Sequence, residues 1–436
     1  MIESLICFAA LFALIAARVP IAISMIFVGT VGFALMRNWT TSFTLLGNVA
    51  FDTVLSFTLS VIPLFVLMGN LLTISGVSNA LFRAAHRALY RLHGGLAMAT
   101  IVACGGFSAV CGSSLATAAT MSKVAMPPMR EVGYAESLAS GSIAAGGTLG
   151  ILIPPSVILI IYGLITEANI AHLFIAGIIP GLLGVLFYIA TVAIVVKIKP
   201  VLAPKDAGKM IITNKDLFGV VSVVGLFAVI MIGIYGGFFT PSEAAAIGAI
   251  FSLIIAICMG GLTFTKLLTA GRDTIRTTAM IFGLIIGAEV FSNLISYSGF
   301  PDEILAWVTA LDLNAYVVIL AIVLIYIFLG AVLESLSMIL LTVPIFFPLV
   351  TSLDFGSGLL SDPAMVAIWF GIIVVVVTEI SLISPPIGLN VFILKSVLKD
   401  IDLMTIFKGV MPFWVADIFR LILLIALPVL SLWLLD

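Results

Sequence analysis

The sequence of 436 residues contains little charge. Only 9% of its residues are Asp, Glu, Lys or Arg, whereas soluble proteins carry roughly 25%. Hydrophobic residues make up 62% of the chain. A water-soluble fold cannot bury so much apolar surface, so the composition excludes a soluble globular protein and makes the lipid bilayer the solvent for most of the chain. The net charge of −2 gives no indication of a nucleic acid partner.

Side chains that support metal or covalent chemistry are also scarce. There are four cysteines and three histidines, and they show neither a CxxC motif nor the spacing of metal ligands. Nucleotide-binding and hydrolase motifs of the GxxxxGK[ST], GxSxG and HExxH types are absent from the sequence. We therefore expect a protein that is not an enzyme, binds no cofactor and does not hydrolyse ATP by itself.

Long continuous apolar runs, such as 217–239, recur from end to end. A transmembrane β-barrel would alternate apolar and polar residues, so the runs favour helices of about 20 residues. The first 17 residues lack the basic start of a signal peptide and are interpreted as the first span. The predicted fold class is an all-α polytopic membrane protein.

Ten apolar runs, bounded by charged residues or by Pro and Gly, predict transmembrane helices. They are approximately 3–17, 20–36, 52–75, 137–165, 172–196, 217–239, 243–262, 277–297, 364–394 and 410–435. Two further segments, about 94–130 and 302–350, are interrupted near their middle by small or polar residues. Their crossing of the membrane is ambiguous from hydropathy alone.

Clusters of basic residues give the topology, because such residues are enriched in cytoplasmic loops. The four clusters are Arg83, Arg87 and Arg91; Lys197, Lys199, Lys205, Lys209 and Lys215; Lys266, Arg272 and Arg276; and Lys395, Lys399 and Lys408. All four lie in the cytoplasm only if 94–130 and 302–350 enter the membrane and return to their own side. They are therefore predicted to be re-entrant hairpins, entering from opposite faces, with both chain ends outside.

This topology predicts two inverted repeats, 1–200 and 217–436, joined by a cytoplasmic connection at 201–216. Each repeat contains a hairpin and a helix broken by two prolines, within 137–165 and 364–394. A single proline is commonly a kink, but paired breaks at matching places favour a function. Inverted repeats with discontinuous helices are typical of secondary transporters, whose sites lie near the midplane.

The hairpins and breaks supply candidate ligands for a small cation, because unwound backbone and hydroxyl groups offer oxygen atoms. The candidate sodium ligands are Ser108, Gly112, Ser113, Ser114, Thr117, Glu334, Ser335, Ser337, Ser381, Ser384, Pro385 and Gly388. The candidate substrate-binding residues at the breaks are Gly150, Pro154, Pro155, Glu379 and Asn390. Close packing of small residues between helices is the alternative interpretation of the first hairpin.

Acidic residues inside a membrane are costly and are functional candidates. Glu334, at the predicted tip of the second hairpin, and Glu379, before the second break, favour ion or substrate handling. For Glu243 and Asp52 an interfacial or helix-capping position is favoured. The role of Glu289 stays open.

Three stretches resemble the large membrane subunit, DctM- and SiaM-like, of tripartite ATP-independent periplasmic (TRAP) transporters. They are 105–121, beginning GGFS; 146–156, GGTLGILIPPS; and 384–390, SPPIGLN. The resemblance covers essentially the whole chain. It implies an elevator-type importer with scaffold and transport domains, coupled to sodium, in which both hairpins and both broken helices move together. Family members often carry an aspartate at the second hairpin tip, where this chain has Glu334.

The resemblance also implies partners. These are a separate small membrane subunit of about four helices and a periplasmic solute-binding protein that delivers an organic acid, such as a C4-dicarboxylate or a sialic-acid-like sugar acid. The expected location is the bacterial inner membrane, with both termini periplasmic. A self-sufficient ion-coupled anion carrier is the main alternative, and a membrane enzyme and an ATP-driven permease are less favoured. The sequence does not identify the substrate, the number of coupling ions or the oligomeric state.

Overall fold

The computed structural model describes residues 2–204, 210–311, 313–330, 332–356 and 358–435. Within these ranges every regular element is a helix. The helices of the first half are α1 (Ile2–Ala16), α2 (Ile21–Met36), α3 (Trp39–Leu55), η1 (Thr58–Ser60), α4 (Val61–Ser75), α5 (Val77–Leu89), α6 (Gly95–Cys111), α7 (Ser114–Glu131), α8 (Glu136–Thr148), η2 (Leu149–Ile151), α9 (Val157–Thr166), α10 (Ile170–Ile198) and η3 (Pro200–Leu202).

The second half continues with α11 (Asn214–Tyr235), α12 (Pro241–Cys258), α13 (Phe264–Tyr297), α14 (Phe300–Ala310), α15 (Ala315–Gly330), α16 (Ser335–Thr351), η4 (Leu359–Ser361), α17 (Pro363–Ile383), α18 (Leu389–Val397), α19 (Leu403–Ala426) and α20 (Val429–Leu432). Lys205 and Lys209 of the predicted basic cluster lie outside the described residues.

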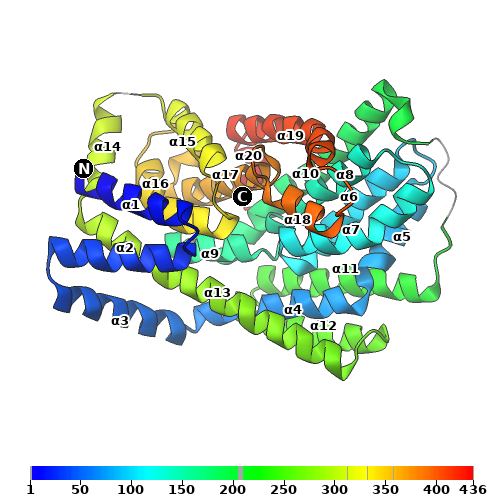
Figure 1. Cartoon of the computed structure of the whole chain (residues 1–436), viewed down its shortest axis with the longest axis horizontal. Helices are drawn as coiled ribbons and strands as arrows, with labels where there is room; N and C mark the ends of the chain where they lie inside the picture. The colour runs from blue at the N-terminus through cyan, green and yellow to red at the C-terminus, as the bar shows by residue number, and fades with distance from the viewer. Residues whose placement is uncertain (1, 205–209, 312, 331, 357, 436) are drawn as a thin grey trace.

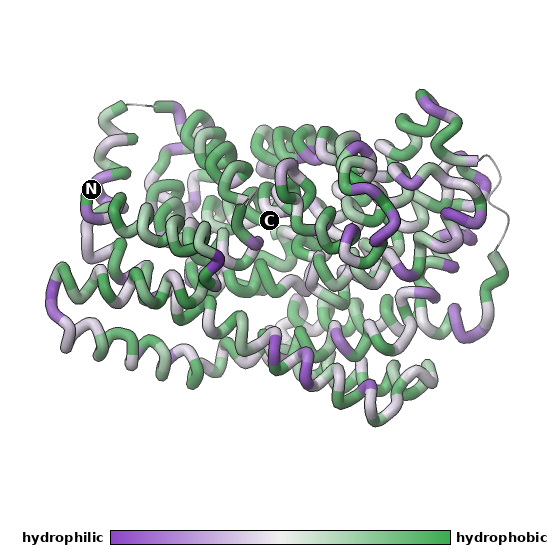
Figure 2. The backbone as a smooth tube through the Cα atoms, in the orientation of Figure 1, coloured by the Kyte–Doolittle hydropathy of each residue, from purple (hydrophilic) through white to green (hydrophobic). Residues whose placement is uncertain are grey.

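Seven helical segments among the described residues are long and apolar enough to cross a membrane. They are Thr58–Ser75, which joins η1 to α4, and the helices α10, α11, α12, α13, α17 and α19. Figure 2 shows the long hydrophobic stretches of these helices, with hydrophilic residues at many connections. The predicted class, an all-helical polytopic membrane protein, is confirmed, whereas the number of ten spans stays a prediction.

The structure differs from the sequence prediction around residue 52. The predicted span 52–75 is divided between α3 and α4, since α3 ends at Leu55 and η1 follows three residues later. Asn38 starts α3, where its side-chain oxygen accepts a hydrogen bond from the Thr41 amide at 2.8 Å. Polar residues in α3, including Asn48, dilute its hydropathy, which explains why the sequence pattern missed this helix.

Two other boundaries differ. Helix α13 begins at Phe264 and has 34 residues, so it is longer than the predicted span 277–297. The segment 302–350 contains most of α14 in addition to α15 and α16, and only the latter two flank the turn at Glu334. Pro301 at the start of α14 and the left-handed Gly299 before it (φ 71°) separate α14 from α13.

One layer of the molecule consists of α2, α3, α4, α12 and α13, and we refer to it as the scaffold group. Helix α13 packs against α2, α3 and α4, while α12 packs against α4. Figure 1 shows these helices together along the lower side of the view. Small residues permit close packing: a Cβ on Gly287 of α13 would lie 2.8 Å from the carbonyl oxygen of Ala22 in α2.

The other layer consists of α6–α10 and α15–α19, and we refer to it as the hairpin group. Helix α19 packs against α8, α10 and α17, and α7 packs against α8 and α18. In both halves of the chain a helix pair (α6–α7, α15–α16) precedes a broken helix (α8–α9, α17–α18) and a long helix (α10, α19). The inverted relation of the two halves, with boundaries at 1–200 and 217–436, stays a prediction.

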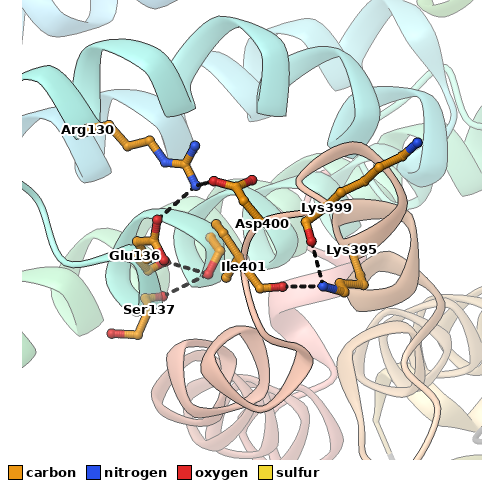
Figure 3. A network of polar contacts seen from close by, with 8 residues as sticks. Arg130, Glu136, Ser137, Lys395, Lys399, Asp400 and Ile401 are labelled. Atoms are coloured by element: carbon orange, nitrogen blue, oxygen red, sulfur yellow. Dashed lines mark hydrogen bonds and ion pairs between the residues drawn. The ribbon is translucent and has the colours of Figure 1, made fainter.

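A polar network joins the ends of three helices of the hairpin group (Figure 3). Arg130, near the end of α7, forms ion pairs with Glu136 at 2.8 Å and with Asp400, which follows α18. The ammonium group of Lys395 donates hydrogen bonds to the carbonyl oxygens of Lys399 and Ile401. The first hairpin is thereby attached to the end of the second broken helix, at the side that the basic residues predict to be cytoplasmic.

Candidate functional site

The first hairpin turns at Gly112 and Ser113. Gly112 has a φ of 62°, a left-handed conformation that glycine adopts without strain, and its amide donates to the carbonyl oxygen of Ser108. The Ser113 side chain then caps α7 by accepting a hydrogen bond from the Ala116 amide. A helix therefore ends and another begins at the same point, leaving carbonyl oxygens and amides without helical partners.

The first helix break lies directly against this turn. Helix α8 ends at Thr148, η2 follows, and Ser156 caps α9 after the cis peptide between Pro154 and Pro155. A Cβ on Gly150 would lie 3.0 Å from the carbonyl carbon of Ser113. In the other direction, a Cβ on Gly112 would lie 3.1 Å from the carbonyl oxygen of Pro155. The absence of a side chain at Gly112 and Gly150 thus lets the turn and the break pack closely.

The second break has the same elements. Helix α17 ends at Ile383, Ser384 follows, and α18 starts after the left-handed Gly388 (φ 59°). The Ser384 hydroxyl donates to the carbonyl oxygen of Ile380 and accepts from the indole nitrogen of Trp414, both at 2.7 Å. Pro385 is exposed, and its peptide bond with Pro386 is cis.

The second hairpin meets this second break. Glu334 and Ser335 lie where α16 begins, and Glu334 occupies the N-cap position without a capping hydrogen bond from its side chain. In the other arm, Gly330 packs so closely on α17 that a Cβ there would lie 2.2 Å from the Cβ of Ser381. Each hairpin is therefore supported by the broken helix of its own half of the sequence.

A cavity of about 320 Å³ lies between both hairpin turns and the scaffold group. It is lined by Val66, Gly69, Asn70, Cys111, Gly112, Ser113, Ser114, Leu115, Ala116, Ile151, Val157, Ile158, Thr277, Met280, Ile281, Glu334, Ser335 and Leu336. The N-termini of α7, α9 and α16 all border this central cavity. No Lys, Arg or His is among the described residues that line it, and Glu334 is its one carboxylate.

The scaffold wall of the central cavity was not foreseen from the sequence. The Asn70 side-chain amide in α4 donates to the Thr274 hydroxyl of α13 at 2.9 Å, which fixes Asn70 beside the cavity. Gly69 lets α4 approach the first hairpin, because a Cβ there would lie 2.8 Å from the carbonyl oxygen of Cys111. A polar residue in an apolar run, as at Asn70, was the available signal.

The structure brings some of the predicted site residues together and separates others. Gly112, Ser113, Ser114, Glu334 and Ser335 line the central cavity. The remaining candidates lie outside its lining: Ser108, Thr117, Gly150, Pro154, Pro155, Ser337, Glu379, Ser381, Ser384, Pro385, Gly388 and Asn390. They belong to the hairpin arms and to the two breaks behind the cavity.

Three hydroxyl groups behind the cavity are suited to a cation. The side chains of Ser108, Thr117 and Ser337 are buried, and the hydroxyl of Ser108 has no hydrogen-bond partner within the described part of the chain. A buried hydroxyl without a partner is costly. Hydroxyl oxygens in the helices that flank the two hairpin turns are a type of ligand that sodium accepts, so the donor set at the two hairpins is compatible with this ion.

Glu379 and Asn390 point into the protein interior. Glu379 forms an ion pair with Arg420 of α19, and both side chains are fully buried. The Asn390 amide donates to the carbonyl oxygen of Ala144 in α8 at 3.1 Å. Asp417 and Arg420 were missed by the sequence interpretation, although two charged residues three positions apart in an apolar span are a visible signal.

A second cavity, of about 510 Å³, lies farther along the boundary between the two groups of helices. Asp52 and Glu289 line it from the scaffold group, and the Thr53 hydroxyl lies 3.5 Å from a carboxylate oxygen of Glu289. Both acids are exposed. Glu243, by contrast, forms a capping box with Thr240 at the start of α12, which confirms its predicted capping position.

Known proteins are similar to this chain over most of its length. The family model described as tripartite ATP-independent periplasmic transporter, DctM component, matches residues 8–430. The C4-dicarboxylate TRAP transporter large permease protein DctM of Pseudomonas aeruginosa is 34% identical over 386 residues, which cover 88% of this chain and 87% of that protein. The sialic acid TRAP transporter large permease protein SiaM of Vibrio cholerae is 30% identical over 419 residues, which cover 95% of this chain and 94% of that protein.

A solved structure is similar in fold. The YdaH transporter of Alcanivorax borkumensis superposes with a TM-score of 0.56 and 16% sequence identity, covering 88% of this chain and 87% of that chain. At this identity the likeness concerns the fold alone.

Proposed function

Because the chain belongs to the DctM-component family of tripartite ATP-independent periplasmic transporters, and is thus a multi-pass transport protein and not an enzyme, we propose that it imports organic acids by sodium coupling. In this proposal it works with a small membrane subunit and a periplasmic solute-binding protein, in the bacterial inner membrane with both termini periplasmic. The substrate is a small carboxylate, as the names of the DctM and SiaM relatives suggest.

The observation that carries the proposal is the convergence of the N-termini of α7, α9 and α16 on the central cavity. Unpaired amides and the positive end of the helix dipole favour an anion at such a point. Because the described lining offers no basic side chain, a carboxylate there depends on these helix ends and on cations held nearby. This dependence is the physical basis of coupling between the substrate and sodium.

Sodium is proposed to bind at the hairpin turns and the helix breaks. Ser113 and Ser114 on one side, and Glu334 and Ser335 on the other, offer oxygens at the cavity. The carboxylate of Glu334 would repel a bound carboxylate, and a cation between them would remove the repulsion. Glu334 thereby makes the binding of the substrate carboxylate more favourable when sodium is bound, and the binding of sodium more favourable when the substrate is bound.

An elevator movement is proposed for the hairpin group relative to the scaffold group. The central cavity has the scaffold helices α4 and α13 as one wall, and the hairpin turns as the other. Displacement of the hairpin group along this wall would carry the site to the other face of the membrane. Gly69, whose missing side chain lets the first hairpin approach α4, permits the contact along which the groups would slide.

Reconstitution tests the proposal. The chain and its small subunit are placed in liposomes with the solute-binding protein outside, and a ligand of that protein, identified by thermal shift, is supplied as the substrate. We expect uptake that requires both an inward sodium gradient and the binding protein. Uptake by the chain without the binding protein would support a self-sufficient anion carrier instead, and uptake unaffected by replacing sodium with potassium would refute sodium coupling.

A further inference from the structure

Helix α19 carries three polar side chains on successive turns of one face, Trp414, Asp417 and Arg420. Asp417 and Arg420 are fully buried, although charged groups in a membrane span are costly and persist where they have a role. None of the three lines the central cavity. Their contacts instead lead to the two helix breaks.

The first and last residues of this face reach the second break. The indole nitrogen of Trp414 donates to the hydroxyl oxygen of Ser384, the residue directly before the two prolines. One turn before the break, the carboxylate of Glu379 forms an ion pair with Arg420. The end of α17 is therefore held to α19 at two points.

The middle residue leads to the first break. Asp417 accepts a hydrogen bond from the hydroxyl group of Tyr188 in α10. The same hydroxyl lies 3.1 Å from the hydroxyl of Thr148, the last residue of α8. Arg420 also approaches this region, since a Cβ on Gly184 would lie 2.0 Å from its Nη1 atom and 2.8 Å from the side chain of Leu149.

The charges of this cluster are interdependent. Arg420 lies 3.0 Å from a carboxylate oxygen of Asp417 in addition to its pair with Glu379. All three side chains are fully shielded from solvent, so each charge depends on the others for compensation. Both breaks therefore contact the same two residues of α19, the first through Thr148 and Tyr188 and the second through Glu379.

We propose that Trp414, Asp417 and Arg420 form a bracket that fixes the two helix breaks relative to each other, and that Tyr188 and Glu379 are its contacts at the breaks. These are positioning residues, since none touches the cavity. The inference rests on the proposed function, in which the breaks and hairpin turns hold the coupling ion. Sites of this kind tolerate misplacement of about 0.5 Å, so a loosened bracket lowers ion affinity.

Two small substitutions test the bracket. Tyr188→Phe removes only the hydroxyl that joins Asp417 to Thr148, and Trp414→Phe removes the indole donor to Ser384. We expect each to raise the half-saturating sodium concentration for uptake at least threefold, while the maximal rate at saturating sodium changes less than twofold. Tyr235→Phe and Trp433→Phe, both at exposed side chains of the same types, are the matched controls and should leave the sodium dependence unchanged.

The ion pairs of Arg420 in the bracket are tested by comparing the Arg420→Lys variant with the Arg420→Gln variant. Lysine keeps the charge but not the two-sided contact, so we expect an intermediate sodium requirement for Arg420→Lys and a higher one for Arg420→Gln. The rise in melting temperature of the purified complex when sodium is added compares sodium binding among the same variants without a transport assay. If the variants melt at lower temperature but keep the sodium dependence of the wild type, the cluster is a structural ion pair and the inference is wrong.

Uptake by the wild-type protein distinguishes a failure of the sodium-coupling proposal from a failure of the bracket proposal. If wild-type uptake does not respond to sodium, the proposed coupling ion is refuted on that result alone. The bracket is then judged by the cation that does drive uptake, through the same half-saturating concentrations in the Tyr188→Phe and Trp414→Phe variants. Unchanged values in both variants for that cation overturn the bracket.

Discussion

The side-chain amide of Asn390, in the helix after the second break, donates a hydrogen bond to the carbonyl oxygen of Ala144, in the helix before the first break. The two residues are 246 positions apart in sequence, yet this bond joins the two broken helices directly. Asn390 is fully buried, and in the described structure its amide connects the two broken helices behind the cavity.

Replacing Asn390 with Ala is expected to destabilise the protein. The variant loses a buried hydrogen bond, at a cost of about 1–2 kcal/mol, and the melting temperature of the purified complex should fall. Asn293→Ala, at an exposed asparagine whose amide bonds within its own helix, is the control. A raised KM for substrate without a lower melting temperature would instead favour direct substrate binding by Asn390.

The two serines at the candidate ion sites are expected to differ. Ser114 lines the central cavity, whereas the Ser384 hydroxyl already donates one hydrogen bond and accepts another. Ser114→Ala should therefore raise the half-saturating sodium concentration of uptake more than Ser384→Ala does. Ser396→Ala, at the exposed end of α18, serves as the reference, and equal sodium dependence in all three variants would contradict both assignments.

Glu334→Gln removes the carboxylate of the central cavity while keeping the shape of the side chain. If the carboxylate holds a cation there, the half-saturating sodium concentration should rise by about tenfold or more, since a charge-assisted contact contributes roughly 1.5–3 kcal/mol. Sodium titration of uptake measures this change. Glu131→Gln, at an exposed residue near the end of α7, is the control, and a sodium curve that coincides with the wild type would exclude Glu334 as an ion ligand.

Gly69→Ala tests the contact between the scaffold group and the first hairpin. The added methyl group would lie 2.8 Å from a backbone oxygen of Cys111, so the hairpin must move away from α4. We expect the rate of uptake to fall by roughly tenfold or more, while the protein inserts normally in the membrane. A tenfold fall corresponds to about 1.4 kcal/mol in the equilibrium or the barrier of the movement between the two groups of helices. Gly47→Ala, at a helix position with no atom near the new methyl group, should transport normally; similar rates for both variants would argue against this contact.

The sequence predicted the helical class, the first hairpin turn and the two helix breaks, because the signals for these features are local, whereas it missed the division between α3 and α4. Gly112 with Ser113 marks the turn between α6 and α7, and prolines at 154–155 and 385–386 mark the two breaks. The contacts of α19 were not predictable in this way. The pairing of Arg420 with Glu379, and of Asn390 with Ala144, depends on tertiary packing of helices far apart in sequence.

The same reason explains which parts of the candidate site were found. Ser113, Ser114, Glu334 and Ser335 lie in the turns, where small and polar residues interrupt an apolar run, and they do line the central cavity. Asn70 is a polar residue within an apolar run, but hydropathy does not indicate which helix such a residue faces, so its place in the wall emerged only from the fold.

The length of α13 has a consequence for the surrounding lipid. Its 34 residues extend about 51 Å, but the basic residues Lys266, Arg272 and Arg276 restrict the apolar part to 277–297. That part is about 31 Å long, close to the roughly 30 Å of a hydrocarbon core, so it is long enough to cross the core. A bilayer thicker than this apolar part would have to thin locally around α13, beside the central cavity that the helix lines.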